Sequence, residues 1–186
     1  MLRAEALSPR DLTCVVVGRG PGSYTGLRVG LSTAKALAYA LGCESRAIDT
    51  FAAVAEQTPP EAQCVWVIAD ALQEQVYVQR FDRTAAGWVP FAELRILGVG
   101  EWLNELPNGA WVSGPGVAVY DSRVPPDRPR VPEADREARV ESAFAVGMRV
   151  KPLTREDLFA LEPLYLRGSS AEEKAKSDAA KAERHP

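Results

Sequence analysis

The chain has 186 residues, of which 46% are hydrophobic, and its 22 basic and 25 acidic side chains give a formal net charge of −3. This length predicts one domain, or one and part of another, with a sizeable core, and the composition excludes a disordered or fibrous protein. The slightly acidic balance argues against tight nucleic-acid binding by this chain alone, because such binding needs a basic surface. No apolar run approaches the roughly 20 residues that cross a bilayer, so we expect no membrane association.

Cysteine and histidine are too few and too scattered for several kinds of site. The three cysteines, Cys14, Cys43 and Cys64, lack the paired spacing of a zinc site or a disulfide framework, which favours a reducing cytoplasm. The single histidine, His185, lies in a polar tail. Without a histidine in the core, neither a histidine metal cluster nor a Ser-His-Asp triad can form. We therefore predict no metal, no cofactor and no catalytic residue.

The predicted elements alternate between strands and helices. Short apolar and β-branched runs predict strands at 13–18, 45–48, 64–69, 75–81, 88–97 and 110–113. Helical spacing and turn residues predict helices at 23–41, 50–57, 101–106 and 133–150. The runs at 64–69 and 75–81 predict an antiparallel hairpin, and the prolines of 121–132 predict an exposed connector. The tryptophans are expected in the core or on sheet faces.

The turn between the first strand and the first helix is rich in glycine. Its sequence, GRGPGS at 18–23, resembles a phosphate cradle at a helix N-terminus. A Walker A loop needs a Gly-Lys-Ser/Thr step that is missing here, and the glycine spacing does not fit a dinucleotide fingerprint. The alternative is structural: Ser23 caps the helix, and the glycines let the chain turn sharply out of the strand.

Small residues recur every four positions along the first helix and form one ridge: Gly22, Gly26, Gly30, Ala34, Ala38 and Gly42. A glycine inside a helix costs about 0.5–1 kcal/mol relative to alanine, so a close approach by another element must offset the cost. That element is either a neighbouring helix of the same chain or a helix of a partner protein. Larger residues off the ridge are expected to pack on the sheet, namely Leu27, Leu31, Tyr39 and Leu41.

This segment resembles a known family. GPGSYTGLRVG at 20–30, followed by AKAL at 34–37, is similar to the signature of the TsaB (YeaZ) family, bacterial subunits required for making N6-threonylcarbamoyladenosine at position 37 of tRNA. Shorter matches follow in the family's order, at 68–71 with 76–77, at 113–116 and at 163–167. In the first of these, Leu72 stands where the family usually has arginine. The resemblance covers residues 7–167.

The resemblance implies a ribonuclease-H-like α/β fold with two lobes, of the actin/Hsp70/sugar-kinase type. Residues 1–50 would be the remainder of an N-terminal lobe, residues 51–167 a C-terminal lobe, and residues 168–186 a disordered polar tail. Family members usually begin about 50–60 residues earlier than this chain. The N-terminal lobe is therefore expected to be incomplete, and the ridge to lack its neighbour within the chain.

The resemblance also implies a scaffold rather than an enzyme. It predicts a cytoplasmic, non-catalytic subunit that binds the catalytic subunit TsaD, with the ATPase TsaE joining them. A homodimer through the same surface is a further expectation, and tRNA would be contacted only through the complex. The predicted partner-binding residues lie on and around the ridge: Tyr24, Gly26, Leu27, Arg28, Gly30, Leu31, Ala34 and Lys35.

Two other functions stay open at this point. A phosphotransferase of the same superfamily would use residues 20–23 as the phosphate cradle and Asp70 as a metal ligand, whereas the simpler role for Asp70 is to cap the hairpin turn. A peptidase would need a base for Ser23. The nearest candidate on the helix, Lys35, lies about 18 Å away at 1.5 Å per residue, which is beyond hydrogen-bond reach.

Overall fold

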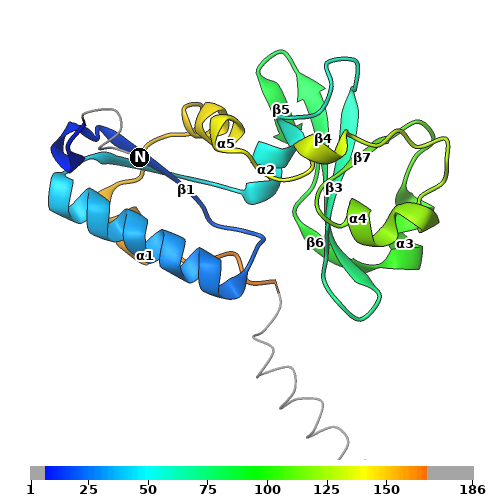
Figure 1. The fold of residues 1–186 in the computed structure, drawn as a ribbon, viewed down its shortest axis with the longest axis horizontal. Helices are drawn as coiled ribbons and strands as arrows, with labels where there is room; N and C mark the ends of the chain where they lie inside the picture. The colour runs from blue at the N-terminus through cyan, green and yellow to red at the C-terminus, as the bar shows by residue number, and fades with distance from the viewer. Residues whose placement is uncertain (1–6, 167–186) are drawn as a thin grey trace, which may run out of the picture.

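Two parallel strands open the part of the chain, residues 7–166, that the computed structural model describes. β1 (Cys14–Gly18) pairs with β2 (Glu44–Ile48), and α1 (Tyr24–Leu41) is the crossover between them (Figure 1). The Ser23 side chain accepts a hydrogen bond from the N–H of Gly26, and Gly42 ends the helix with φ 67°. Both ends of the predicted helix, and both predicted strands, are confirmed.

A second sheet holds five strands, in the order β5-β4-β3-β7 with β6 also on β4. Its strands are β3 (Cys64–Asp70), β4 (Gln75–Thr84), β5 (Gly87–Pro90), β6 (Arg95–Gly98) and β7 (Trp111–Ser113). β3 and β4 form the predicted antiparallel hairpin. The single strand expected at 88–97 is wrong: the chain leaves the sheet after Pro90, so β5 pairs with residues 81–84 of β4 and β6 with residues 75–78.

Five further α-helices cover these sheets: α2 (Thr50–Ala55), α3 (Val99–Glu105), α4 (Val117–Tyr120), α5 (Val140–Gly147) and α6 (Arg155–Ala160). The long helix predicted at 133–150 is wrong in extent. Only α5 is α-helical there, because this is the stretch that packs against β1, β2 and α2, while residues 133–135 form a separate 3-10 turn. α6 was not predicted, since its only buried residue is Leu158 and it offers no apolar pattern.

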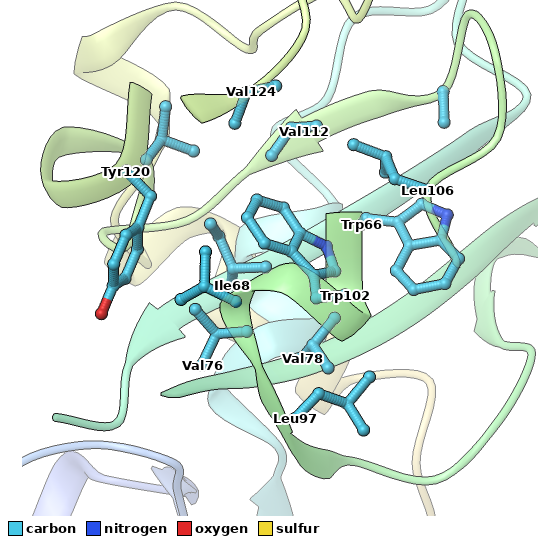
Figure 2. Close-up of a cluster of buried hydrophobic side chains, with 13 residues drawn as sticks. Trp66, Ile68, Val76, Val78, Leu97, Trp102, Leu106, Val112, Tyr120 and Val124 are labelled. Carbon is cyan, nitrogen blue, oxygen red and sulfur yellow. The ribbon is translucent and has the colours of Figure 1, made fainter. Parts of the chain in front are cut away.

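The core lies mainly on the two faces of the second sheet. On one face, β3, β4 and β7 bury valines and Ile68 against Trp102 of α3 and Tyr120 of α4 (Figure 2). On the other face, Phe51 of α2 packs with Phe81 of β4 and with both valines of β3, Val65 and Val67. Trp66 and Trp102 are buried, and Trp88 and Trp111 are half-buried against the second cluster, as predicted for the tryptophans.

The connector at 121–132 is exposed at only half of its residues, so the prediction of an exposed connector is correct only in part. Val124, Arg128 and Val131 are buried, with Val131 at 0% exposure. The Arg130 guanidinium donates hydrogen bonds to four carbonyl oxygens of the connector, and Val131 N–H donates to the carbonyl of Val112 in β7. The segment therefore lies along the edge of the sheet, beside β7.

The last described residues return to the first sheet. Leu153 N–H donates to the carbonyl of Ser45 in β2, and Leu164 N–H donates to the carbonyl of Arg19 after β1. Residues 140–166 therefore lie with the N-terminal elements, whereas the division into lobes at residue 50 stays a prediction. The predicted disordered tail, 168–186, lies outside the described residues. No helix within residues 7–166 is long and apolar enough to cross a membrane.

Candidate functional site

One face of α1 is buried by the chain itself. Leu31 is 3% exposed and Ala34 is 2% exposed, and both pack with Val17 of β1. Leu161, near the end of the described residues, lies against the same cluster. Leu31 and Ala34 therefore hold α1 on its own sheet. Both were predicted to bind a partner, but the structure buries them within the chain.

A second face of α1 is covered by residues 154–166, which we call the C-terminal strap. Arg28 Nε donates to the hydroxyl of Tyr165 at 2.8 Å, and its guanidinium lies 4.3 Å from the centre of the Tyr24 ring. Lys35 Nζ donates to two strap carbonyls, Phe159 at 2.9 Å and Leu161 at 2.7 Å. Three of the predicted partner-binding residues, Tyr24, Arg28 and Lys35, thus bind the chain's own strap, which sequence spacing could not indicate.

Tyr39 belongs to the same contact. It is 66% exposed, so the prediction that it packs on the sheet is wrong. Its ring meets the edge of Phe159 at a centroid distance of 6.1 Å, and the Arg155 guanidinium lies 5.1 Å from its centre. The strap is therefore held on α1 at each end by one arginine that lies over two aromatic rings, Arg28 at one end and Arg155 at the other.

The third face of α1 is left open by the residues that the structure describes, 7–166. We define the open face by the residues Gly26, Val29, Gly30, Thr33 and Ala36. None of them is charged, Val29 is 60% exposed, and a Cβ at Gly30 would meet nothing within 4 Å. The outward face of a solvated helix normally carries charged side chains, so an uncharged face with two glycines is suited to contact with another protein surface.

Of the predicted partner-binding set, only Gly26 and Gly30 lie on this open face, and Leu27 is half-buried. Val29, Thr33 and Ala36 were missed. Their signal was the absence of charge at 25, 26, 29, 32, 33, 36 and 40, positions that share one side of a helix.

The glycine turn is closed by the chain's own atoms. A Cβ at Gly20 would lie 3.2 Å from Leu27 Cδ1 and 3.4 Å from the carbonyl oxygen of Leu164. Gly20 has φ +124°, a conformation that favours glycine. Beside it, Arg19 Nε donates to Asp49 Oδ1 at 2.6 Å, and this hydrogen bond raises the pKa of Arg19. The geometry favours the sharp-turn interpretation over a phosphate cradle.

Asp70 caps the hairpin turn, as predicted for its structural role. Its Oδ1 accepts the N–H of Leu72 at 2.9 Å and the hydroxyl of Tyr120 at 2.7 Å. The hairpin turn was predicted, but its left-handed backbone was not: Leu72, Gln73 and Glu74 all have positive φ. Burial, together with the hydrogen bond to Asp70, raises the pKa of Tyr120 to about 12.

This pKa gives a testable dependence of stability on pH. The unfolded chain loses the Tyr120 proton near pH 10, whereas the folded chain keeps it to about pH 12. The contribution to the free energy of unfolding is therefore complete below pH 10 and is lost as the pH rises toward 12. We expect denaturant titrations of Tyr120→Phe to show a shallower fall over this range than the parent chain, and parallel curves would contradict the assignment.

Within residues 7–166, no group of three His, Cys, Asp or Glu side chains is placed to hold a metal ion. The three cysteines are free thiols. His185 lies outside the described residues.

Comparisons with known proteins converge on one superfamily. The family model described as TsaD, tRNA N6-adenosine threonylcarbamoyltransferase, matches residues 1–114. The tRNA threonylcarbamoyladenosine biosynthesis protein TsaB of Bacillus subtilis is 38% identical over 71 residues, which are 38% of this chain and 31% of that protein. An uncharacterised protein of Mycobacterium tuberculosis is 40% identical over 80 residues, 43% of this chain and 36% of that protein. The matches thus span about a third of the length of these relatives.

Solved structures agree on the fold. YeaZ from Pseudomonas aeruginosa superposes with a TM-score of 0.70 at 20% identity, over 89% of this chain and 78% of that chain. A second structure, titled as an uncharacterised protein from the same organism with similarity to peptidase YeaZ, gives a TM-score of 0.66 at 21% identity, over 89% and 79%. The predicted α/β fold of the ribonuclease-H-like, actin-like type is confirmed.

Proposed function

Because the chain belongs to the TsaD family of tRNA N6-adenosine threonylcarbamoyltransferase proteins and is TsaB/YeaZ-like within that superfamily, we propose that it is a non-catalytic scaffold subunit of the cytoplasmic machinery that makes threonylcarbamoyladenosine in tRNA. Its task is to bind and position the subunit that carries out the transfer. The slightly acidic net charge of −3 supports contact with tRNA through the complex rather than by this chain alone.

The observation that carries this proposal is the open face of α1. The other two faces of the helix are covered by the first sheet and by the C-terminal strap, so α1 is fixed in place before any partner binds. Val29 is exposed beside two glycines, so another helix can approach α1 closely. Because α1 is already rigid, it loses little conformational freedom when that helix binds. The occupant we propose is a helix of a TsaD-like catalytic subunit.

Two further partners belong to the proposal. A TsaE-like ATPase joins the pair, and a second copy of the chain binds when the catalytic subunit is absent. No residue of this chain is assigned a chemical step, because the glycine turn is filled by Leu27 and Leu164 and because Asp70 is engaged by Leu72 and Tyr120.

The test is a charge placed on the open face. Val29→Lys should weaken capture of a TsaD-like subunit at least about tenfold, because a buried, unpaired ammonium opposes docking. The matched control is Val119→Lys on α4, at the far end of the molecule (Figure 1), where the parent valine is 57% exposed against 60% for Val29. Both variants should keep the melting temperature of the parent, since both side chains already face solvent.

Co-purification of the tagged chain with the TsaD-like subunit, followed by titration of the purified pair, measures the effect. Equal weakening by both lysines would place the interface elsewhere or reduce it to general electrostatics. Binding of magnesium-ATP by the chain alone, with release of phosphate, would overturn the scaffold role.

A further inference from the structure

The outer edge of β4 has a gap in the middle of the second sheet. β5 pairs with residues 81–84 of β4 and β6 with residues 75–78, so no strand within residues 7–166 lies opposite Gln79 and Arg80 on that side. The Arg80 carbonyl accepts the N–H of Phe91 at 2.9 Å, and in an antiparallel sheet the N–H and C=O of one residue point to the same side. The Arg80 N–H is therefore directed into the gap, beside the loop that joins β5 to β6.

A pocket of about 450 Å³ lies at this gap. Trp66 and Gln79 both line it, although their side chains belong to opposite faces of the sheet. Trp66 packs in the same cluster as Val78, and Gln79 alternates with Val78 along β4. Because no described strand closes the edge at 79–80, the pocket passes round the edge of β4 and reaches both residues. Its volume is in the range of small-ligand sites.

Two polar atoms of the pocket walls have no hydrogen-bond partner within residues 7–166. They are Nε1 of Trp66 and Oε1 of Gln79, and these residues are only 5% and 6% exposed. The Gln79 amide is fixed, because its Nε2 donates to the carbonyl of Ala92 at 3.1 Å and leaves Oε1 as the acceptor. Figure 2 shows the indole nitrogen of Trp66 turned away from Trp102. A buried donor or acceptor without a partner costs free energy, so this pair is suited to a ligand that supplies both an acceptor and a donor.

The pocket also offers an aromatic surface. The Phe91 ring is 63% exposed, and the Arg80 guanidinium lies 4.0 Å from its centre. Asp82 holds the guanidinium in place by accepting two hydrogen bonds from it, at 2.9 Å and 3.1 Å. Aromatic rings and arginine planes stack on flat heterocycles. The pocket therefore favours a planar ring over an aliphatic ligand.

The charges that line the pocket favour a neutral ring with N–H donors. Arg95 is paired with Glu105 at 2.6 Å, and Arg80 is paired with Asp82. Glu93 also lines the pocket, and no residue of the described chain forms an ion pair with it. Its carboxylate opposes an anionic ligand and accepts charge-assisted hydrogen bonds from N–H groups.

We propose that this pocket binds a guanine-type base, as the free base or as a nucleoside. Guanine carries carbonyl and ring-nitrogen acceptors together with an amino group and a ring N–H. Its acceptors suit the Trp66 N–H, and its donors suit Gln79 Oε1 and the Glu93 carboxylate. Phe91 supplies the stacking surface. The pocket lies on the second sheet, so this inference is independent of the open face of α1 and goes beyond the scaffold role.

The test is a titration of the full chain with guanosine, followed by the indole N–H signals in proton–nitrogen correlation NMR spectra. The Trp66 signal should move with a saturable dissociation constant of about 1 mM or tighter, while the Trp102 signal stays in place. Guanosine should bind at least about tenfold more tightly than adenosine, which has no ring N–H beside its amino group to complete a paired contact with a carboxylate.

Trp66→Phe removes the indole donor and should weaken guanosine binding at least about tenfold in calorimetry. Trp102→Phe is the matched control, because Trp102 also has a buried Nε1 without a partner in the described chain but does not line the pocket. Glu93→Gln is a second route that does not disturb the core, since Glu93 is exposed. It should weaken guanosine by about tenfold and leave adenosine unchanged.

Three results would each overturn the proposal. One is a Trp66 signal that guanosine does not move. Another is equal loss of binding in Trp66→Phe and Trp102→Phe, which would place the ligand elsewhere. The third is equal affinity for guanosine and adenosine, with no effect of Glu93→Gln, which would reduce the contact to stacking alone.

Discussion

Gly114→Ala is expected to lower the free energy of unfolding by about 3 kcal/mol or more, since it combines a disfavoured backbone conformation with a severe overlap. Gly114 has φ +97°, and a Cβ there would lie 2.2 Å from the carbonyl oxygen of Ile68. That carbonyl belongs to β3 and also accepts the N–H of Gly116 at 3.0 Å. Neither backbone can move aside, because Ile68 is fully buried in the core cluster (Figure 2).

Substitution of a second glycine separates the effect of the backbone conformation from that of the overlap. Gly109 also has positive φ, at +70°, but a Cβ there would meet nothing within 4 Å. Gly109→Ala should therefore cost only about 1–2 kcal/mol, the penalty of the left-handed conformation alone. Urea denaturation of both variants measures the difference. If the two alanines cost the same, the close packing of Gly114 on β3 is wrong.

Local sequence signals were enough to predict the elements nearest the candidate site. Ser23 caps α1 and Gly42 ends it because each supplies a hydrogen bond or a backbone angle that other residues supply poorly. The hairpin of β3 and β4 followed from two alternating apolar runs, and Asp70 caps its turn as expected. In each case the determining contact lies within a few residues along the chain.

The incorrect predictions concern features whose determining contacts are distant in sequence. The break between β5 and β6, the burial of Arg128 and the exposure of Tyr39 all depend on residues distant in sequence. The strap is the clearest case, since Arg28 meets Tyr165 across 137 positions. Arginine and lysine on a helix usually indicate a solvated face. Nothing in the local sequence shows that Arg28 and Lys35 donate to phenol and backbone oxygens of the same chain.

The candidate site was therefore only partly predictable. The ridge of small residues located the candidate helix, but it could not distinguish its buried half, Ala34 and Ala38, from the half left open, Gly26 and Gly30. That distinction depends on where β1 and the strap lie relative to α1. The absence of charge on the open face is visible in the sequence, and it becomes informative once the other two faces are known to be covered.

Gly147→Ala is expected to cost about 2–3 kcal/mol by forcing α5 away from β1. A Cβ at Gly147 would lie 2.6 Å and 2.7 Å from the two Cγ atoms of Val16. Valine cannot swing aside, because its branched side chain has few alternative rotamers. This contact joins the returning C-terminal segment to the first sheet, so the cost measures how firmly α5 is held on β1.

A double-mutant cycle makes that assignment specific. Val16→Ala removes both Cγ atoms and should cost about 1–2 kcal/mol as a partly buried truncation. In the double variant the two alanines fill the space that glycine and valine share, so its total cost should be well below the sum of the single costs. Additive costs in denaturant titrations would mean that α5 does not approach β1 at Gly147.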